Sequence, residues 1–192
     1  MKIGVFCSAN NNIDPEFFER TKKFGQWIGA NHHTVTYGGC NIGLMECIGK
    51  SVHEAGGKTI GVVPNIVEEG GKKSEYIDIT FPCDNLSERK DLIMMQSDIT
   101  VALPGGIGTI DEIFTVAASA SIGYHDKRVI LYNVKGFWNP LIAVLEDLQT
   151  MGFIRGDYHR HIDIANSFDE LIEKITQNKH ADVENRTLTQ EE

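Results

Sequence analysis

The residues of this sequence that are best suited to chemistry lie in one stretch, Pro104-Gly-Gly-Ile-Gly-Thr-Ile-Asp-Glu112. Three glycines between an apolar run and a helical pattern are typical of a turn with free backbone N–H groups. These groups lie at the positive end of a helix dipole, where phosphate binds readily. The stretch therefore predicts a phosphate site formed by Gly105, Gly106, Ile107, Gly108 and Thr109.

The same stretch also has a purely structural interpretation. Thr109-x-x-Glu112 matches a capping box, in which Glu112 would only accept an N–H bond at the helix start. The glycine spacing fits neither the dinucleotide motif G-x-G-x-x-G nor the nucleoside-triphosphate motif G-x-x-x-x-G-K-[ST]. A nicotinamide cofactor and a nucleoside triphosphatase are therefore disfavoured.

A second charged motif, Glu88-Arg89-Lys90, stands upstream of the same apolar run. Charged residues at the start of a helix are commonly just solvated. The guanidinium of Arg89, however, is a planar fork suited to a carboxylate or a phosphate. Arg89 would meet the glycine turn if its helix packs beside the strand that precedes the turn.

Length, composition and charge exclude several classes of protein. The 192 residues are 41% hydrophobic, which is enough for one domain with a substantial core. The net charge of −9 argues against a nucleic-acid partner. The four cysteines form no C-x-x-C pair and no metal-ligand pattern, so we expect no metal. No stretch predicts a signal peptide or a membrane span, and we expect a cytoplasmic protein.

Apolar patterning predicts alternating strands and helices. The expected strands are 2–7, 35–37, 59–63, 76–81, 99–103, 129–133 and 162–165. The expected helices begin at Asp14 or Pro15 and at Thr109, and cover 43–55, 86–96, 140–151 and 168–175. Residues 65–74 are expected to form a loop, and 177–192 a flexible polar tail. The pattern predicts an α/β fold of the Rossmann-like, doubly wound kind, with a single domain over residues 1–176 and helices on both faces of a parallel sheet.

A sheet of this kind has a crevice at the carboxyl ends of its strands, where the strand order reverses. Three loops follow strands and are expected to line that crevice: residues 8–11, 38–43 and 104–109.

The paired motifs around Arg89 and Glu112 resemble the signature of the Lonely Guy family, cytokinin riboside 5′-monophosphate phosphoribohydrolases often labelled "lysine decarboxylase". Further matches extend the resemblance from residue 3 to about residue 155: Val5-Phe6-Cys7, Tyr37-Gly38-Gly39, Gly43-Leu44-Met45, Gly61-Val62-Val63-Pro64 and Gly123-x-His125-x-Lys127.

The resemblance implies a Rossmann-like homodimer that cleaves the N-glycosidic bond of a purine nucleoside 5′-monophosphate without a cofactor. It maps the catalytic pair onto Arg89 and Glu112 and the phosphate site onto residues 105–109. The expected substrate contacts also include Ser8, Gly39, Glu46 and Lys90.

That chemistry suits the residues. Cleavage of an N-glycosidic bond passes through an oxocarbenium-like ribose, which a carboxylate stabilises or supplies with an activated water. Glu112 lies one helical turn from the glycine turn and is placed for either role. Arg89 would hold Glu112 ionised and oriented, or would contact the nucleotide directly.

Several positions depart from the family pattern. The first loop reads Cys7-Ser8-Ala9-Asn10 in place of Cys-Gly-Ser-Ser, and Glu46 stands where a glycine is common. Glu46 is either a second carboxylate near the ribose or an exposed helix residue. Ser119 replaces a common tryptophan, so we expect unmodified AMP to be accepted alongside N6-prenylated AMP.

Two functions of different classes remain open at this point. One is a hydrolase of adenosine-type 5′-monophosphates, and the other is a non-catalytic nucleotide-binding sensor or carrier of the same fold. A carrier needs only the phosphate turn, so the presence of both Arg89 and Glu112 favours the hydrolase. The small residues of 117–121 predict a close helix contact, which we assign to a homodimer.

Overall fold

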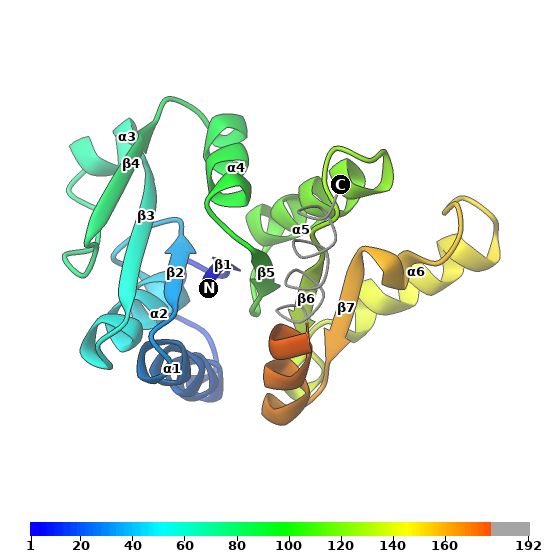
Figure 1. The fold of residues 1–192 in the computed structure, drawn as a ribbon, viewed down its shortest axis with the longest axis horizontal. Helices are drawn as coiled ribbons and strands as arrows, with labels where there is room; N and C mark the ends of the chain where they lie inside the picture. The colour runs from blue at the N-terminus through cyan, green and yellow to red at the C-terminus, as the bar shows by residue number, and fades with distance from the viewer. Residues whose placement is uncertain (178–192) are drawn as a thin grey trace, which may run out of the picture.

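The strands of the sheet are added in one direction from its centre and then in the other. In the computed structural model, which describes residues 1–177, seven parallel strands are arranged β4-β3-β2-β1-β5-β6-β7 (Figure 1). Successive strands run outward from β1 to β4, and the chain then returns to pair β5 with the other side of β1. The strands are β1 (Lys2–Phe6), β2 (Thr34–Tyr37), β3 (Lys58–Pro64), β4 (Ile79–Cys83), β5 (Ile99–Ala102), β6 (Val129–Tyr132) and β7 (Ile162–Ala165).

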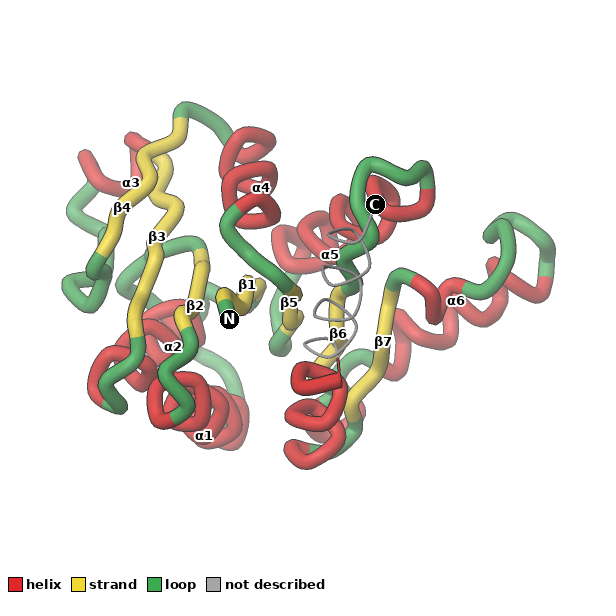
Figure 2. Tube along the Cα trace, viewed as in Figure 1, coloured by secondary structure: helices red, strands yellow, loops and turns green. Residues whose placement is uncertain are grey.

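Helices cover both faces of this sheet (Figure 2). They are α1 (Pro15–Ala30), α2 (Gly43–Glu54), α3 (Asn65–Glu69), α4 (Leu86–Met95), α5 (Ile107–Ser121) and α6 (Asn139–Thr150), and residues 168–177 are also helical. One face packs against α1, α2 and the helix at 168–177, and the other packs against α4, α5 and α6. This is the doubly wound α/β fold that the sequence predicts.

The two faces of the sheet are built from alternating residues of the same strands. In β1, Ile3 and Val5 join the core beside α1 and α2, whereas Phe6 joins the core beside α5. In β5, Val101 and Ala102 divide in the same way. Burial on both faces explains why the central strands read as continuous apolar runs rather than alternating ones.

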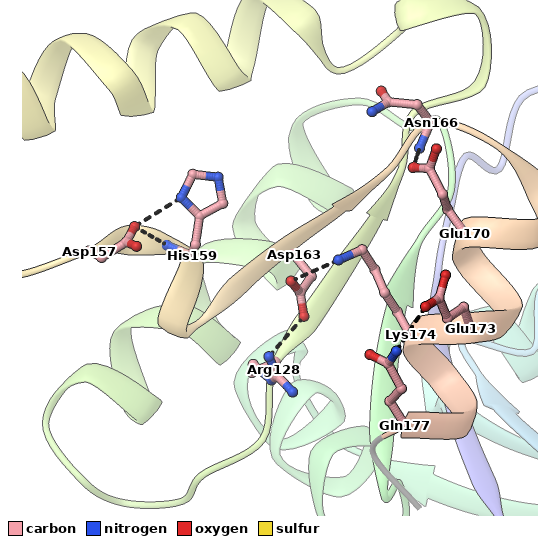
Figure 3. A network of polar contacts seen from close by, with 9 residues as sticks. All are labelled: Arg128, Asp157, His159, Asp163, Asn166, Glu170, Glu173, Lys174 and Gln177. Atoms are coloured by element: carbon pink, nitrogen blue, oxygen red, sulfur yellow. Dashed lines mark hydrogen bonds and ion pairs between the residues drawn. The ribbon is translucent and has the colours of Figure 1, made fainter.

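Polar contacts tie the last elements to the sheet. The carboxylate of Asp163 in β7 lies 3.1 Å from the guanidinium of Arg128 and 3.3 Å from the ammonium of Lys174 (Figure 3). Asp163 is only 16% exposed at its side chain, so the two cations share one shielded anion. The helix at 168–177 is thereby joined to β7 and to the entry of β6.

Two expected elements are wrong in detail. Residues 65–69, expected within a loop, form the short helix α3, whose residues are not buried. The fourth strand begins at Ile79 rather than residue 76. Before it, the Thr59 hydroxyl donates to the Tyr76 carbonyl at 2.5 Å, and the Thr59 N–H donates to the Asp78 carboxylate at 2.8 Å. These side-chain contacts replace the ladder that an earlier strand start would need.

The expected tail falls largely outside the described residues. Residue 177 is still helical, and the structure does not describe residues 178–192. Among the helices of residues 1–177, none combines the length and the apolar character needed to cross a bilayer.

Candidate active site

An open cleft of about 390 Å³ lies at the carboxyl ends of β1 and β5, where the strand order reverses. Such a reversal is where α/β sheets leave room for a ligand, because the connections on either side diverge. The cleft is lined by Cys7, Ser8, Ala9, Asn10, Met45, Arg89, Gly106, Gly108, Thr109 and Glu112. It thus brings together residues that are up to 105 positions apart in the chain.

Backbone contacts of the first loop fix the walls of this cleft. The N–H of Ser8 donates to the carbonyl of Pro104 at 3.1 Å. The carbonyl of Ser8 accepts the N–H groups of Leu44 at 2.9 Å and Met45 at 3.3 Å. The loop after β1 is therefore bonded both to the loop after β5 and to the start of α2.

The glycine turn opens directly into α5. The helix begins at Ile107, with Gly106 as its N-cap, and the N–H of Ile110 donates to the Gly106 carbonyl at 3.0 Å. The N–H groups of residues 107–109 precede any intrahelical acceptor, so they are available to an anion. A side chain at Gly105 would overlap the Thr109 hydroxyl, whereas Gly106 and Gly108 face open space.

The capping-box interpretation of Thr109-x-x-Glu112 is wrong. Because α5 begins two residues earlier than expected, Glu112 is the sixth residue of the helix rather than its third. The N-cap is Gly106, which has no side chain to donate or accept. Glu112 therefore does not cap the helix, and its carboxyl faces the cleft.

Burial controls the acidity of Glu112. The residue is only 7% exposed, and desolvation raises its pKa to about 7. The positive charges of Arg89 and, more weakly, Lys90 oppose this rise, and the neighbouring carboxylate of Asp111 adds to it. Glu112 is consequently a carboxyl group that gains or loses its proton near neutral pH, as an acid–base group requires.

Arg89 reaches the cleft from α4 and is held by backbone carbonyls. Its Nε donates to the Val62 carbonyl at 3.2 Å, and its Nη2 donates to the Gly38 carbonyl at 2.8 Å. The same Nη2 lies 3.8 Å from the sulfur of Met45. A side chain at Gly38 would occupy the space of the guanidinium, so this glycine is needed for Arg89 to lie where it does.

The structure brings most of the predicted site residues to the cleft, but not all of them. Ser8, Arg89, Gly106, Gly108, Thr109 and Glu112 line it. Gly105 lines an adjoining hollow of about 250 Å³ together with Gly106, and the side chain of Ile107 is 88% exposed.

Three further predicted contacts lie away from the cleft walls. Gly39 is buried with φ +69°, a conformation that glycine tolerates and that turns the chain after β2. Glu46 is half-buried on α2 and does not line the cleft. Lys90 does not line it either, because its ammonium is paired with Asp111 on α5. Ser119, half-buried further along α5, is also absent from the cleft walls.

Four lining residues were not among the individually predicted site residues: Cys7, Ala9, Asn10 and Met45. Ala9 and Asn10 belong to the loop at 8–11 that was expected to line the crevice, and the place of Cys7 directly before that loop was the signal that could have identified it. Burial raises the pKa of the Cys7 thiol well above its ordinary value, so this thiol is protonated at neutral pH. Residues 1–177 contain no cluster of three or more potential metal ligands.

Comparison with known proteins identifies the family. A family model described as "Possible lysine decarboxylase" matches residues 45–175, which include Arg89 and the whole glycine turn. The "Probable cytokinin riboside 5'-monophosphate phosphoribohydrolase LOGL2" of Oryza sativa subsp. japonica is 33% identical over 174 residues, covering 91% of this chain and 71% of the relative. The chain belongs to the LOG family.

A second LOG relative agrees with this assignment, and two solved structures share the fold. The cytokinin riboside 5'-monophosphate phosphoribohydrolase LOG5 of Arabidopsis thaliana is 33% identical over 175 residues, covering 91% of this chain and 76% of its own. The crystal structure of TM1055 has a TM-score of 0.72 at 26% identity, covering 92% of this chain and 98% of that one. The molybdenum cofactor carrier protein of Chlamydomonas reinhardtii has a TM-score of 0.70 at 23% identity over 93% and 98%, which shows a shared fold.

The Arg89 cradle of this LOG-family chain can be tested through Gly38. Gly38→Ala should displace the guanidinium, because the added methyl group would overlap it. If Arg89 acts in catalysis, kcat for a nucleoside 5′-monophosphate should fall about 10²-fold, since small misplacements of catalytic groups are costly. The Gly38→Ala/Arg89→Ala double variant should lose no more than Arg89→Ala alone. Additive losses would show that Gly38 acts independently of Arg89.

The burial of Glu112 predicts a pH-dependent cost to stability. Its pKa is about 7 in the folded protein against about 4.5 for a glutamate exposed to water, so the folded protein binds more protons between these values. Stability should therefore fall as pH rises through this window, by about 3 kcal/mol at most. Glu112→Gln should stabilise the protein more at pH 8 than at pH 5, as measured by urea unfolding. Glu75→Gln, at an exposed position, is the matched control and should show the same effect at both pH values.

Proposed function

We propose that this chain hydrolyses the N-glycosidic bond of purine nucleoside 5′-monophosphates, releasing the free base and ribose 5-phosphate. The observation that carries the proposal is one cleft holding a helix N-terminus, a buried carboxyl group and a guanidinium. The phosphate of a nucleoside monophosphate supplies the anion for the helix N-terminus. The ribose attached to it would then place its anomeric carbon near the carboxyl group and the guanidinium. The names of the LOG relatives state this class of activity for those proteins.

In the proposed reaction, the bond between ribose C1′ and the purine nitrogen breaks and leaves positive charge on the ribose. The ionised carboxylate of Glu112 stabilises that charge and takes a proton from the attacking water, whose hydroxyl adds to C1′. The departing base keeps the bonding electrons and takes a proton from solvent, and Glu112 then releases to solvent the proton that it removed from water. Arg89 favours the ionised form of Glu112, because its positive charge lowers the pKa that burial raises.

The proposal is tested first by Glu112→Gln. The amide keeps the shape of the side chain but carries no negative charge, so kcat for AMP should fall about 10²- to 10⁴-fold. Binding of AMP, measured by calorimetry, should change little. In the wild type, kcat should rise with pH through a limb near 7, where Glu112 ionises. Unchanged turnover in a folded variant would remove Glu112 from the mechanism and favour a nucleotide carrier.

The second prediction concerns the phosphate. Hydrogen bonds to a charged group contribute about 1.5–3 kcal/mol each, so the loss of two should cost roughly a hundredfold or more. We therefore expect kcat/KM for AMP to exceed that for adenosine by at least this factor. Equal values for the two would contradict the assignment of residues 105–109 to the phosphate.

Base selection is a finer part of the proposal. We expect AMP to be accepted alongside N6-isopentenyl-AMP, because Ser119 replaces a large aromatic residue. Ser119 does not line the cleft, so the residue at this position would contact a base substituent that extends beyond the cleft walls. A lysine decarboxylase is disfavoured, since it would need a Schiff-base lysine and no lysine lines the cleft of the described chain.

We also propose a homodimer that acts in the cytoplasm. The outward side of α5 and the loop after it expose Phe114, Ile122 and Tyr124, which are 38%, 67% and 80% exposed. Large exposed apolar side chains on a helix and on the loop that follows it favour association between chains. Light scattering at micromolar concentration should give twice the mass of one chain, and Ile122→Asp should lower that mass. A monomeric wild type would contradict the proposal.

A further inference from the structure

Lys90 and Asp111 form a two-pronged ion pair between α4 and α5. The ammonium of Lys90 lies 2.9 Å from Oδ1 and 2.8 Å from Oδ2 of Asp111. The Lys90 side chain is 17% exposed and the Asp111 side chain 54%, so the pair is shielded from water on the lysine side alone. Within residues 1–177 no other ion pair joins these two helices.

The pair occupies a particular place in the sequence. Lys90 immediately follows Arg89, and Asp111 immediately precedes Glu112. Each member is therefore one residue from a member of the proposed catalytic pair, on the same helix. Lys90 also lies outside the cleft walls with both carboxylate oxygens of Asp111 bound to it, which is a poor arrangement for binding substrate phosphate.

The two helices are anchored to the sheet very differently. Within α5, Ile113, Val116, Ala117 and Ala120 are buried, along with Thr109 and Glu112. Within α4, Ile93 is fully buried, and Leu92 and Met94 are partly buried against the same core. A helix with so little buried surface gains little positional restraint from packing alone. The polar contacts that α4 makes therefore add to the restraint that packing places on Arg89.

We propose that Lys90 and Asp111 are a positioning pair, which fixes α4 against α5 and so sets how Arg89 faces Glu112 across the cleft. This inference rests on the proposed hydrolase function. The pair does not contact the reacting atoms. It acts by joining the helix that carries the guanidinium to the helix that carries the carboxyl group.

The pair also sets the charge around Glu112. The charged and titratable groups that act on Glu112 or on its neighbours are Arg89 and Lys90 from α4, Asp111 from α5, and Cys7 at the end of β1. Asp111 raises the pKa of Glu112, whereas Lys90 lowers it, so together they partly cancel. Removal of either member leaves the effect of the other uncompensated.

The experiment compares Lys90→Met, Asp111→Asn and the double variant in the full-length protein, with AMP as the substrate. Each single change should lower kcat about tenfold with little change in KM, because misplaced catalytic groups lose turnover. The double variant should lose no more than the more impaired single variant, as expected for residues that act through one contact. A KM that rises only in Lys90→Met would overturn the proposal, because it would place Lys90 on the substrate.

If Lys90 and Asp111 only stabilised the fold, their removal would not shift the pH dependence of kcat in opposite directions. The limb of kcat that reports Glu112 should move to higher pH in Lys90→Met and to lower pH in Asp111→Asn. Shifts in the same direction, or additive losses in the double variant, would overturn the proposal. Arg20→Met is the matched control, because it breaks the exposed Arg20–Glu16 ion pair on α1, and it should leave both kcat and the pH limb unchanged.

One readout separates this inference from the hydrolase proposal. Carbon-13 NMR titration of Glu112 without substrate, assigned by comparison with Glu112→Gln, should show the same two opposite shifts. If the wild type does not cleave AMP but the shifts are present, the hydrolase function fails while the electrostatic role of the pair stands. If AMP is cleaved and the shifts are absent, the positioning pair fails while the hydrolase proposal stands.

Discussion

The pairing of β1 with β5 is the constraint on which the site depends. Because the strand order reverses between these strands, the loops that follow them diverge above the sheet and leave a cleft. The backbone bond from Ser8 to Pro104 then holds the two loops together at its base. No single loop could form this cleft, since its walls come from the ends of two strands and from three helices.

Within that cleft, the positive charge of Arg89 partly offsets the desolvation of the Glu112 carboxylate. Desolvation of Glu112 would leave a neutral acid, and the guanidinium of Arg89 opposes this. Arg89 in turn donates to the carbonyl of Val62 in β3 and to the carbonyl of Gly38, the residue that follows β2. Two neighbouring strands, β2 and β3, thus hold in place the cation that keeps the pKa of the buried Glu112 from rising further.

The same fold is shared by proteins with different named roles. The chain has similar overall structure to the molybdenum cofactor carrier of Chlamydomonas reinhardtii, although only 23% of residues are identical. Fold alone therefore does not decide between a carrier and a hydrolase. What separates them physically is a group that acts on the transition state, and for this chain that question rests on Glu112.

The sequence by itself determined the α/β fold and the glycine turn, because burial on both faces and a buried strand followed by glycines leave strong local patterns. It also indicated Arg89 and Glu112 as a pair. Tertiary structure alone decided where α5 begins, which excluded a capping role for Glu112. It also showed that Lys90 binds Asp111 and that Met45 touches Arg89. These contacts join residues 21 and 44 positions apart, and the packing that brings them together has no local signature in the chain.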